Sequence, residues 1–201
     1  MENTKNLKNK VYSKIRMEKY KMRSTGIVRR IDSLGRIVIP KEIRRTMNIK
    51  DYDALEMFTE KEGRIILKKY SPIKEMGNSA QQCAEAIAAQ IPHTVCICDQ
   101  DEVIAAVGRN AKELFGKLLH EKAEEALLER KNLLMERDEE EFFPLITDFP
   151  EIFRYVCLAT IISEGEAIGL VCILSSDEEL THQELLVARI GAGFLGKQLE
   201  L

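Results

Sequence analysis

The sequence predicts an α+β protein in two parts: a small basic unit of short strands with one short helix, and a larger acidic domain of helices and an antiparallel sheet. Three observations lead to this prediction. The 201 residues are 45% hydrophobic and 31% charged, a balance typical of globular domains. Short apolar runs with strand or helix spacing alternate with turn-forming residues along the chain. The charge also changes sign between the two parts.

The change of sign is large. Residues 1–21 carry 7 Lys and Arg against 2 Asp and Glu, residues 22–70 carry 12 against 7, and residues 71–201 carry 11 against 24. The net charges are therefore +5, +5 and −13. A basic N-terminal part joined to an acidic remainder is typical of a DNA-contacting module attached to a domain of another kind. The alternative interpretation is a basic surface that only contacts solvent. A more specific pattern is needed to decide between DNA binding and this alternative.

Composition excludes several classes of protein. The chain has neither collagen-like repeats nor the cysteine density of a disulfide miniprotein, and it is too apolar for a disordered protein. Apolar runs such as residues 167–174 are much shorter than the roughly 20 residues that span a bilayer, and the first residues lack the apolar segment of a secretion signal. The five cysteines have no framework spacing. We therefore expect a cytoplasmic protein with reduced thiols and no membrane contact.

The N-terminal part divides into an extension and a small folded unit. Residues 1–21 have no good apolar period and many Lys and Asn residues, which predicts a flexible basic extension. The folded unit, residues 22–72, has the pattern of four short strands and one helix; the strands are expected at 25–32, 36–39, 54–59 and 64–69, and the helix at 41–48. The 49 residues from 22 to 70 bury too small a core to fold stably alone, so we expect an intertwined or otherwise obligate dimer.

The C-terminal domain, residues 73–201, has the pattern of an α+β fold with an antiparallel sheet. Two strands at 153–162 and 167–174 are apolar on both faces, which places them centrally in a sheet covered on both sides. Thr181 and Glu184 form a capping box for a final helix. The other expected elements are a helix at 71–91, strands at 94–98 and 102–107, helices at 111–119 and 121–130, and a loop at 142–151.

Two patterns that resemble functional sites have a simpler explanation. Gly191–Gly196 reads G-x-G-x-x-G but lies inside the final helix, so we interpret Ala188, Ala192 and Gly196 as a small-residue ridge against a helix or a second subunit. Potential metal ligands gather at residues 93–99, namely His93, Cys96, Cys98 and Asp99, without the paired spacing of a zinc site. We expect no metal and no cofactor, and no motif indicates an enzyme.

Arginine in the small N-terminal unit is the strongest functional signal. Arg29 and Arg30 lie on the first expected strand, Arg36 follows the turn, and Arg44 and Arg45 lie on the short helix. Guanidinium groups suit bidentate contacts with phosphates and guanine edges. Scattered surface salt bridges are the alternative, but only Asp32 and Glu42 lie near these arginines in sequence. The five arginines are therefore the predicted DNA-binding residues.

These residues also carry a family resemblance. The segment from Met22 to Tyr70, with its core L-G-R-I-V-I-P-K-E-I-R-R, resembles the AbrB-type transition-state regulators of spore-forming bacteria. The resemblance implies a dimeric swapped-hairpin β-barrel that binds DNA through Arg29, Arg36, Arg44 and Arg45, with Arg30 in a basic position beside them. Residues 1–21 depart from the family pattern. By the order of its elements, the C-terminal domain resembles a GAF domain, a sensory fold.

Taken together, these features predict a sequence-selective transcription regulator of sporulation genes, activating some and repressing others. It would bind double-stranded DNA as a dimer, and its C-terminal domain would assemble dimers into a tetramer through the helices that begin near Ser71 and Thr181. The resemblance places it in the forespore. Two alternatives stay open: an antitoxin-like module that binds a protein, and a signalling protein that senses a small molecule of unknown identity under the loop at 142–151.

Overall fold

A computed structural model describes residues 25–60, 63–76 and 78–200. The predicted extension, residues 1–21, lies outside the described residues. Contacts between Cα atoms divide the chain into two units between Met47 and Asn48, and each unit is described by itself. The division of the chain into domains at residue 72, expected from the sequence, stays a prediction.

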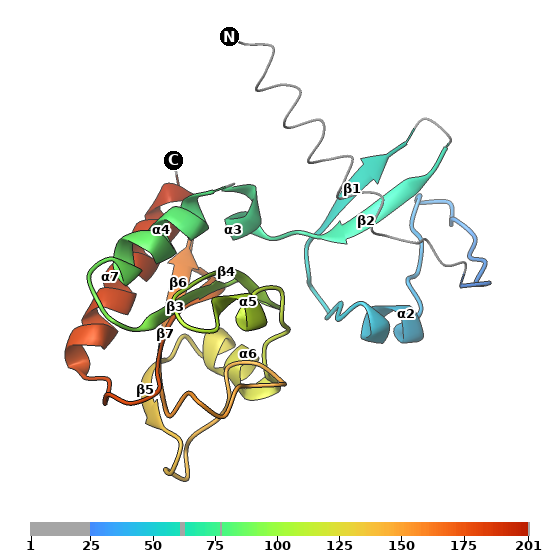
Figure 1. Ribbon diagram of the computed structural model, residues 1–201. Helices are drawn as coiled ribbons and strands as arrows, with labels where there is room; N and C mark the ends of the chain where they lie inside the picture. Colours follow the sequence, from blue (N-terminus) through green and yellow to red (C-terminus); the bar gives the residue numbers. More distant parts are fainter. Residues whose placement is uncertain (1–24, 61–62, 77, 201) are drawn as a thin grey trace. The chain divides into compact units, whose positions relative to one another are not determined.

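The first unit contains an extended segment, a turn and one short helix. Residues 25–38 are all exposed, and the helix α2 (Lys41–Thr46) follows them (Figure 1). The strands predicted at 25–32 and 36–39 are not formed, so this prediction is wrong for the single chain. A strand needs a neighbour for its backbone hydrogen bonds. The turn is nevertheless closed, because the Asp32 backbone N–H donates to the Arg36 carbonyl at 3.1 Å.

The second unit begins with a two-stranded hairpin. Strands β1 (Leu55–Thr59) and β2 (Ile65–Lys69) pair antiparallel with Met57 opposite Leu67, close to the boundaries predicted from the sequence. The face of the hairpin that carries Met57 and Leu67 is apolar and exposed to solvent. On this face Met57 is 63% exposed and Ile65 is 57% exposed. An isolated two-stranded sheet is marginally stable in water. The hairpin therefore presents an apolar face that lacks a cover within its own unit.

A five-stranded antiparallel sheet forms the centre of the second unit, in the order β4-β3-β7-β6-β5. The antiparallel α+β prediction is confirmed. The strands are β3 (Thr94–Cys98), β4 (Val103–Val107), β5 (Asn132–Glu136), β6 (Tyr155–Ser163) and β7 (Glu166–Ser175). The helices are α3 (Pro72–Glu75), α4 (Ser79–Ala88), α5 (Ala111–Leu114), α6 (Glu121–Leu128) and α7 (His182–Gln198).

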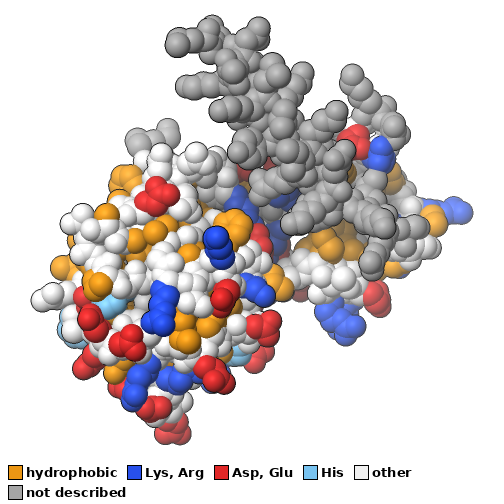
Figure 2. All heavy atoms as spheres, in the orientation of Figure 1, with side chains coloured by type: hydrophobic (Ala, Val, Ile, Leu, Met, Phe, Trp, Pro, Cys, Tyr) orange, Lys and Arg blue, Asp and Glu red, His pale blue; other side chains and the backbone are white. Residues whose placement is uncertain are grey.

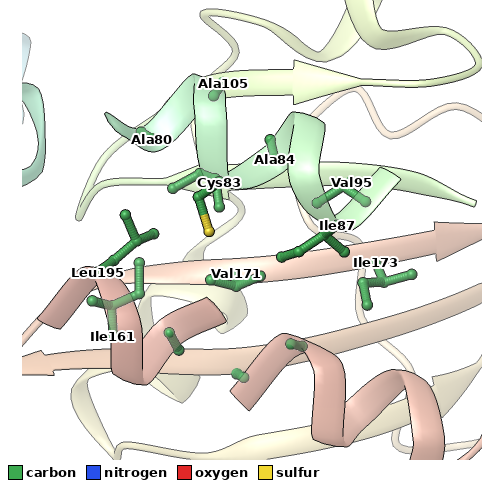
Figure 3. Packing of buried hydrophobic residues seen from close by; sticks show 14 of the residues in the cluster. Ala80, Cys83, Ala84, Ile87, Val95, Ala105, Ile161, Val171, Ile173 and Leu195 are labelled. Carbon is green, nitrogen blue, oxygen red and sulfur yellow. The ribbon is translucent and has the colours of Figure 1, made fainter. Parts of the chain in front are cut away.

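Both faces of this sheet are buried. Helices α4 and α7 cover one face, and α6 with the loop at 142–151 covers the other (Figure 1). Alternate residues of β6 supply the two layers: Cys157 and Ile161 belong to the α4/α7 layer, while Leu158 belongs to the opposite one. Figure 3 shows the first layer, in which Cys83 and Ile87 of α4 and Leu195 of α7 meet Val171 of the sheet. The prediction of a doubly covered central hairpin is confirmed.

Three elements differ from the sequence prediction. The single helix expected at 71–91 is two helices, because α3 ends at Glu75 and the sequence before α4 contains a Gly-Asn pair of weak helix formers. The helix expected at 111–119 is only α5, of four residues. The edge strand β5 was not predicted, since a short run with mixed polarity has no clear period of two.

The small residues of α7 allow close packing within the chain. A Cβ atom on Gly196 would lie 2.1 Å from the Ile162 carbonyl oxygen of β6, and one on Gly191 would lie 2.8 Å from Ile87 Cδ1 of α4. Of the ridge predicted from the sequence, Ala188 and Ala192 are buried in the cluster that α4 also lines, while Gly196 approaches the sheet. Gly193, on the same helix, has nothing within 4 Å of such a Cβ position.

This difference predicts opposite effects of two matched substitutions. Gly196→Ala should lower the free energy of unfolding by about 1–3 kcal/mol, because the methyl group must displace backbone. Gly193→Ala should raise it by about 1 kcal/mol, the ordinary gain in helix propensity. Urea denaturation followed by circular dichroism measures both. Equal effects of the two substitutions would contradict the close approach of α7 to β6.

Candidate nucleic-acid interface

The candidate interface is the basic first unit. Its described residues, 25–47, contain six Lys and Arg and two Asp and Glu. Arg29 and Arg30 precede the turn, Arg36 follows it, and Arg44 and Arg45 lie in the last turn of α2. Arg44 is half-buried and the other four are exposed. The structure therefore places all five predicted arginines in one unit, on two local elements.

Asp32 organises the turn that carries Arg36. One carboxylate oxygen, Oδ1, accepts the backbone N–H groups of Leu34 and Arg36, each at 2.9 Å. The other, Oδ2, accepts the Arg36 Nε–H at 2.7 Å. Gly35 takes φ +77°, a left-handed conformation that suits glycine. The backbone N–H of Arg36, its guanidinium and the Leu34 N–H together hold the pKa of Asp32 below its ordinary value.

Helix α2 presents the second pair of arginines. Pro40, with φ −58°, is preorganised for helix entry, and its carbonyl accepts the Arg44 N–H at 3.0 Å. Arg44 and Arg45 lie at the C-terminal end, where the helix dipole favours cations. Asn48 follows at φ 48°, in the left-handed region that commonly ends a helix. Lys41 is exposed on the same helix. A further basic residue on the helix that carries Arg44 and Arg45 could have been added to the predicted DNA-binding residues on that ground.

Salt bridges explain only part of the arginine set. Arg36 is paired with Asp32, whereas the Arg29 guanidinium donates to the neighbouring Val28 carbonyl at 3.0 Å. Arg30 and Arg45 form no ion pair with the residues that the structure describes. By contrast, the lysines at the start of the second unit, Lys50 and Lys69, are bound to carboxylates. A polyanion such as DNA binds to exposed cationic groups that are not already neutralised by neighbouring carboxylates.

The C-terminal domain has a different surface. Figure 2 shows acidic and basic side chains interspersed over the visible face of this domain. The loop at 142–151, under which a ligand pocket was predicted, buries its own Phe143, Leu145 and Ile146 in the core. Arg137 holds this loop by donating to the carbonyls of Phe153 and Pro150, both at 3.1 Å. The space beneath the loop is therefore occupied by its own side chains.

A shallow depression lies elsewhere, between the start of β3 and the end of β7. His93, Arg109 and residues 175–178 line it, and His93 Nε2 is 4.0 Å from the Glu178 carboxylate. All five cysteines are buried free thiols. Within residues 25–60, 63–76 and 78–200, no group of three or more His, Cys, Asp or Glu residues is arranged to hold a metal ion. No helix of that same part of the chain is long and apolar enough to cross a membrane.

Comparisons with known proteins agree with this division. Residues 75–200 match the family model described as "Stage V sporulation protein T C-terminal, transcription factor". Stage V sporulation protein T of Bacillus subtilis (strain 168) is 40% identical over 179 residues, which cover 89% of this chain and 99% of that protein. The chain belongs to the stage V sporulation protein T family. It is accordingly a transcription regulator of sporulation, and the predicted AbrB-type resemblance is confirmed.

The two parts of this family member have separate relatives. The transition state regulatory protein AbrB of Bacillus subtilis (strain 168) is 61% identical over 51 residues, 25% of this chain and 52% of that protein. Residues 28–75 also match the model described as "Antidote-toxin recognition MazE, bacterial antitoxin". A GAF domain/HD domain protein from Geobacter sulfurreducens matches 66% of this chain and 99% of its own at 10% identity and a TM-score of 0.50. That likeness confirms the GAF-like fold.

The Asp32 turn predicts a titration behaviour. Since the folded-state pKa of Asp32 is lowered, its stabilisation of the turn is present above the ordinary pKa and is lost as pH falls through the folded value. Carbon-detected NMR should show Asp32 titrating below its ordinary range. Arg36→Gln should raise that pKa only part of the way, because the two backbone donors remain. An unchanged pKa in Arg36→Gln would show that the guanidinium does not hold the carboxylate.

Proposed function

We propose that this regulator binds double-stranded DNA sequence-selectively through Arg29, Arg30, Arg36, Arg44 and Arg45, as a homo-oligomer. It activates some sporulation genes and represses others, in the cytoplasm of the forespore. The observation that carries the proposal is the exposure of Arg29, Arg30, Arg36 and Arg45 in one small basic unit, where Arg36 is held by Asp32 of its own turn. The relatives support it, since one is named a transition state regulatory protein.

The exposed apolar side chains of residues 27–38 support a dimer. This segment has a closed turn and extended arms, yet Val28 is 83% exposed and Val38 is 73% exposed. Apolar strand-forming residues do not remain in water at these fractions when a partner strand is available. The hairpin of β1 and β2 also has an open apolar face. A second copy of the chain would cover both, which is the swapped-hairpin barrel of residues 22–72 implied by the resemblance to AbrB.

A two-fold dimer has consequences for the DNA. Arginines from both chains would contact the duplex together, so targets should be roughly palindromic. If a dimer neutralises about eight phosphates, the logarithm of affinity should fall with the logarithm of salt at a slope of roughly −7. Few Asn or Gln side chains accompany the arginines in residues 25–47. Part of the selectivity should therefore come from DNA shape and flexibility.

Fluorescence anisotropy with a labelled duplex from a sporulation promoter tests the arginines. Arg36→Ala with Arg44→Ala should weaken binding at least about 100-fold and make the salt slope shallower. Arg30→Ala with Arg45→Ala should also weaken it strongly, and this pair of substitutions breaks no ion pair between described residues.

The matched control for this experiment removes two exposed arginines of the C-terminal domain. Arg109→Ala with Arg130→Ala takes away the same charge and should leave affinity nearly unchanged. If the wild-type chain binds no DNA, or if all three double variants behave alike, the DNA interface is wrong. The match to the MazE antitoxin model then makes a protein partner the next hypothesis to test.

The final helix supports assembly beyond a dimer. One side of α7 is buried against β6 and α4, while the other exposes Leu186 (55%), Ile190 (63%) and Phe194 (52%) at spacings of four residues. These three side chains form one stripe along the helix. A second copy of α7 presents the same apolar stripe, and self-association is the simplest way to cover it. We therefore assign tetramer formation to α7, one of the two helices predicted from the sequence.

Substitution of this stripe tests the assembly. Ile190→Glu with Phe194→Glu should convert a tetramer into a dimer, as measured by light scattering after size-exclusion chromatography. Gln183→Glu with Gln198→Glu adds the same charge at exposed positions of the same helix and should leave the mass unchanged. A tetramer that survives in the first variant would show that α7 is not the contact.

A further inference from the structure

A cluster of carboxylates in the C-terminal domain binds the segment that follows the arginine helix. We call this cluster the carboxylate clamp; its members are Asp99, Asp101 and Glu102 in the β3–β4 turn and Glu124 in α6. The groups that it binds come from residues 48–74, namely Asn48, Lys50, Lys69 and Lys74. All of these residues belong to the second unit.

Asn48 is the residue closest in sequence to the arginines. It is separated from α2 only by Met47, and its left-handed backbone marks the end of that helix. Its side-chain amide donates to Asp101 Oδ1 at 3.0 Å and to Glu124 Oε1 at 3.3 Å. The Lys50 ammonium donates to the other Glu124 oxygen at 2.6 Å. The first residues after the arginine helix are therefore fixed by side chains of the β3–β4 turn and α6.

Lys69 joins the hairpin to the same clamp. Its ammonium lies 2.6 Å from Asp101 Oδ1 and 3.1 Å from Asp53 Oδ2, and it also donates to the Asn48 carbonyl at 3.3 Å. Burial acts to lower the pKa of Lys69, but hydrogen bonds and charges from Asp101 and Asp53 outweigh it and raise that pKa. The side chains of Lys69, Asp53 and Asp101 are 14–19% exposed. Partly buried pairs of this kind are costly to break from one side.

The β3–β4 turn is itself tied to the sheet. Asp99 has a side chain only 3% exposed; its Oδ1 accepts the backbone N–H groups of Asp101 and Glu102, and its Oδ2 lies 2.6 Å from the Lys74 ammonium. Gln100 donates to the Ala167 carbonyl of β7 at 2.9 Å. A shift of β3 or β7 would therefore displace Asp101, the turn carboxylate that binds both Asn48 and Lys69.

We propose that the carboxylate clamp preorders residues 48–70, the segment that follows the arginine helix in the chain, and thereby raises the affinity for DNA. The clamp orders residues 48–70 before DNA is bound, so less ordering has to occur on binding. The proposal rests on the DNA-binding function proposed above. It also gives the β3–β4 turn an effect on DNA affinity, because this turn binds Asn48, which follows α2 in the chain after Met47.

Two variants of the full-length protein remove clamp carboxylates without changing side-chain size: Asp101→Asn and Glu124→Gln. Glu125→Gln is the matched control, since Glu125 is exposed on the same helix and loses the same charge. Without DNA, amide hydrogen exchange in residues 48–56 and 63–70 should become roughly tenfold faster in the clamp variants than in the control. Equal exchange in all three variants would overturn the clamp, whatever the DNA results.

DNA affinity is the second measurement. The clamp variants should bind about three- to tenfold more weakly than Glu125→Gln with the same salt slope, because no phosphate contact is lost. Faster exchange with unchanged affinity would overturn the link to DNA binding while leaving the clamp as a local contact. A wild-type chain that binds no DNA would defeat the proposed function instead, and the exchange result would still report on the clamp.

Exchanging the charges of Lys50 and Glu124 separates loss of this ion pair from general loss of stability. Lys50→Glu alone and Glu124→Lys alone place like charges 2.6 Å apart in the present geometry, so each should accelerate exchange in residues 48–56. The double variant restores an ion pair at the same place and should recover most of the protection. Additive rather than compensating effects in the double variant would show that the Lys50–Glu124 pair does not hold this segment.

Discussion

The requirement that every strand find a neighbour for its backbone hydrogen bonds governs both parts of this protein. In the C-terminal domain the requirement is met within one chain, because β6 and β7 pair along their length and β3, β4 and β5 extend the sheet. Residues 27–38 form no strand with another described segment, and their apolar side chains stay exposed. A domain that cannot complete its own sheet depends on a second copy, so oligomerisation and DNA binding are proposed for the same small unit.

Electrostatics divides the basic residues into two groups with different roles. Lys50, Lys69 and Lys74 are bound to carboxylates and connect the segment after α2 to the C-terminal sheet. Arg30 and Arg45 keep their charge exposed, and Arg36 is tied only to the aspartate of its own turn. This arrangement separates the cations that hold the protein together from those available to a polyanion, although both kinds lie within 50 residues of one another in the sequence. Net charge alone does not make this distinction.

The local features of the fold were predictable, and the reasons are local. The capping box of Thr181 and Glu184, the left-handed Asn48 and the doubly apolar hairpin each depend on residues close together in sequence. The strand β5 and the break after Glu75 were missed because their formation depends on long-range pairing and on weak helix formers whose effect is small. The five arginines lie in one unit, as their positions in the sequence imply, and their contact with DNA stays a prediction, whereas the pairing of Arg36 with Asp32 needed the turn geometry.

By itself, the sequence determined the family, the α+β class, the change of charge along the chain and the arginine set, since these depend on residue identity and short-range periodicity. Only the tertiary structure decided that the arms at 25–38 lack strand partners in the described chain, that the loop at 142–151 fills its own space, and that four carboxylates bind residues 48–74. The physical reason is sequence separation. Asn48 and Glu124 are 76 residues apart, and no local pattern shows that a fold will bring an amide and a carboxylate within hydrogen-bonding distance.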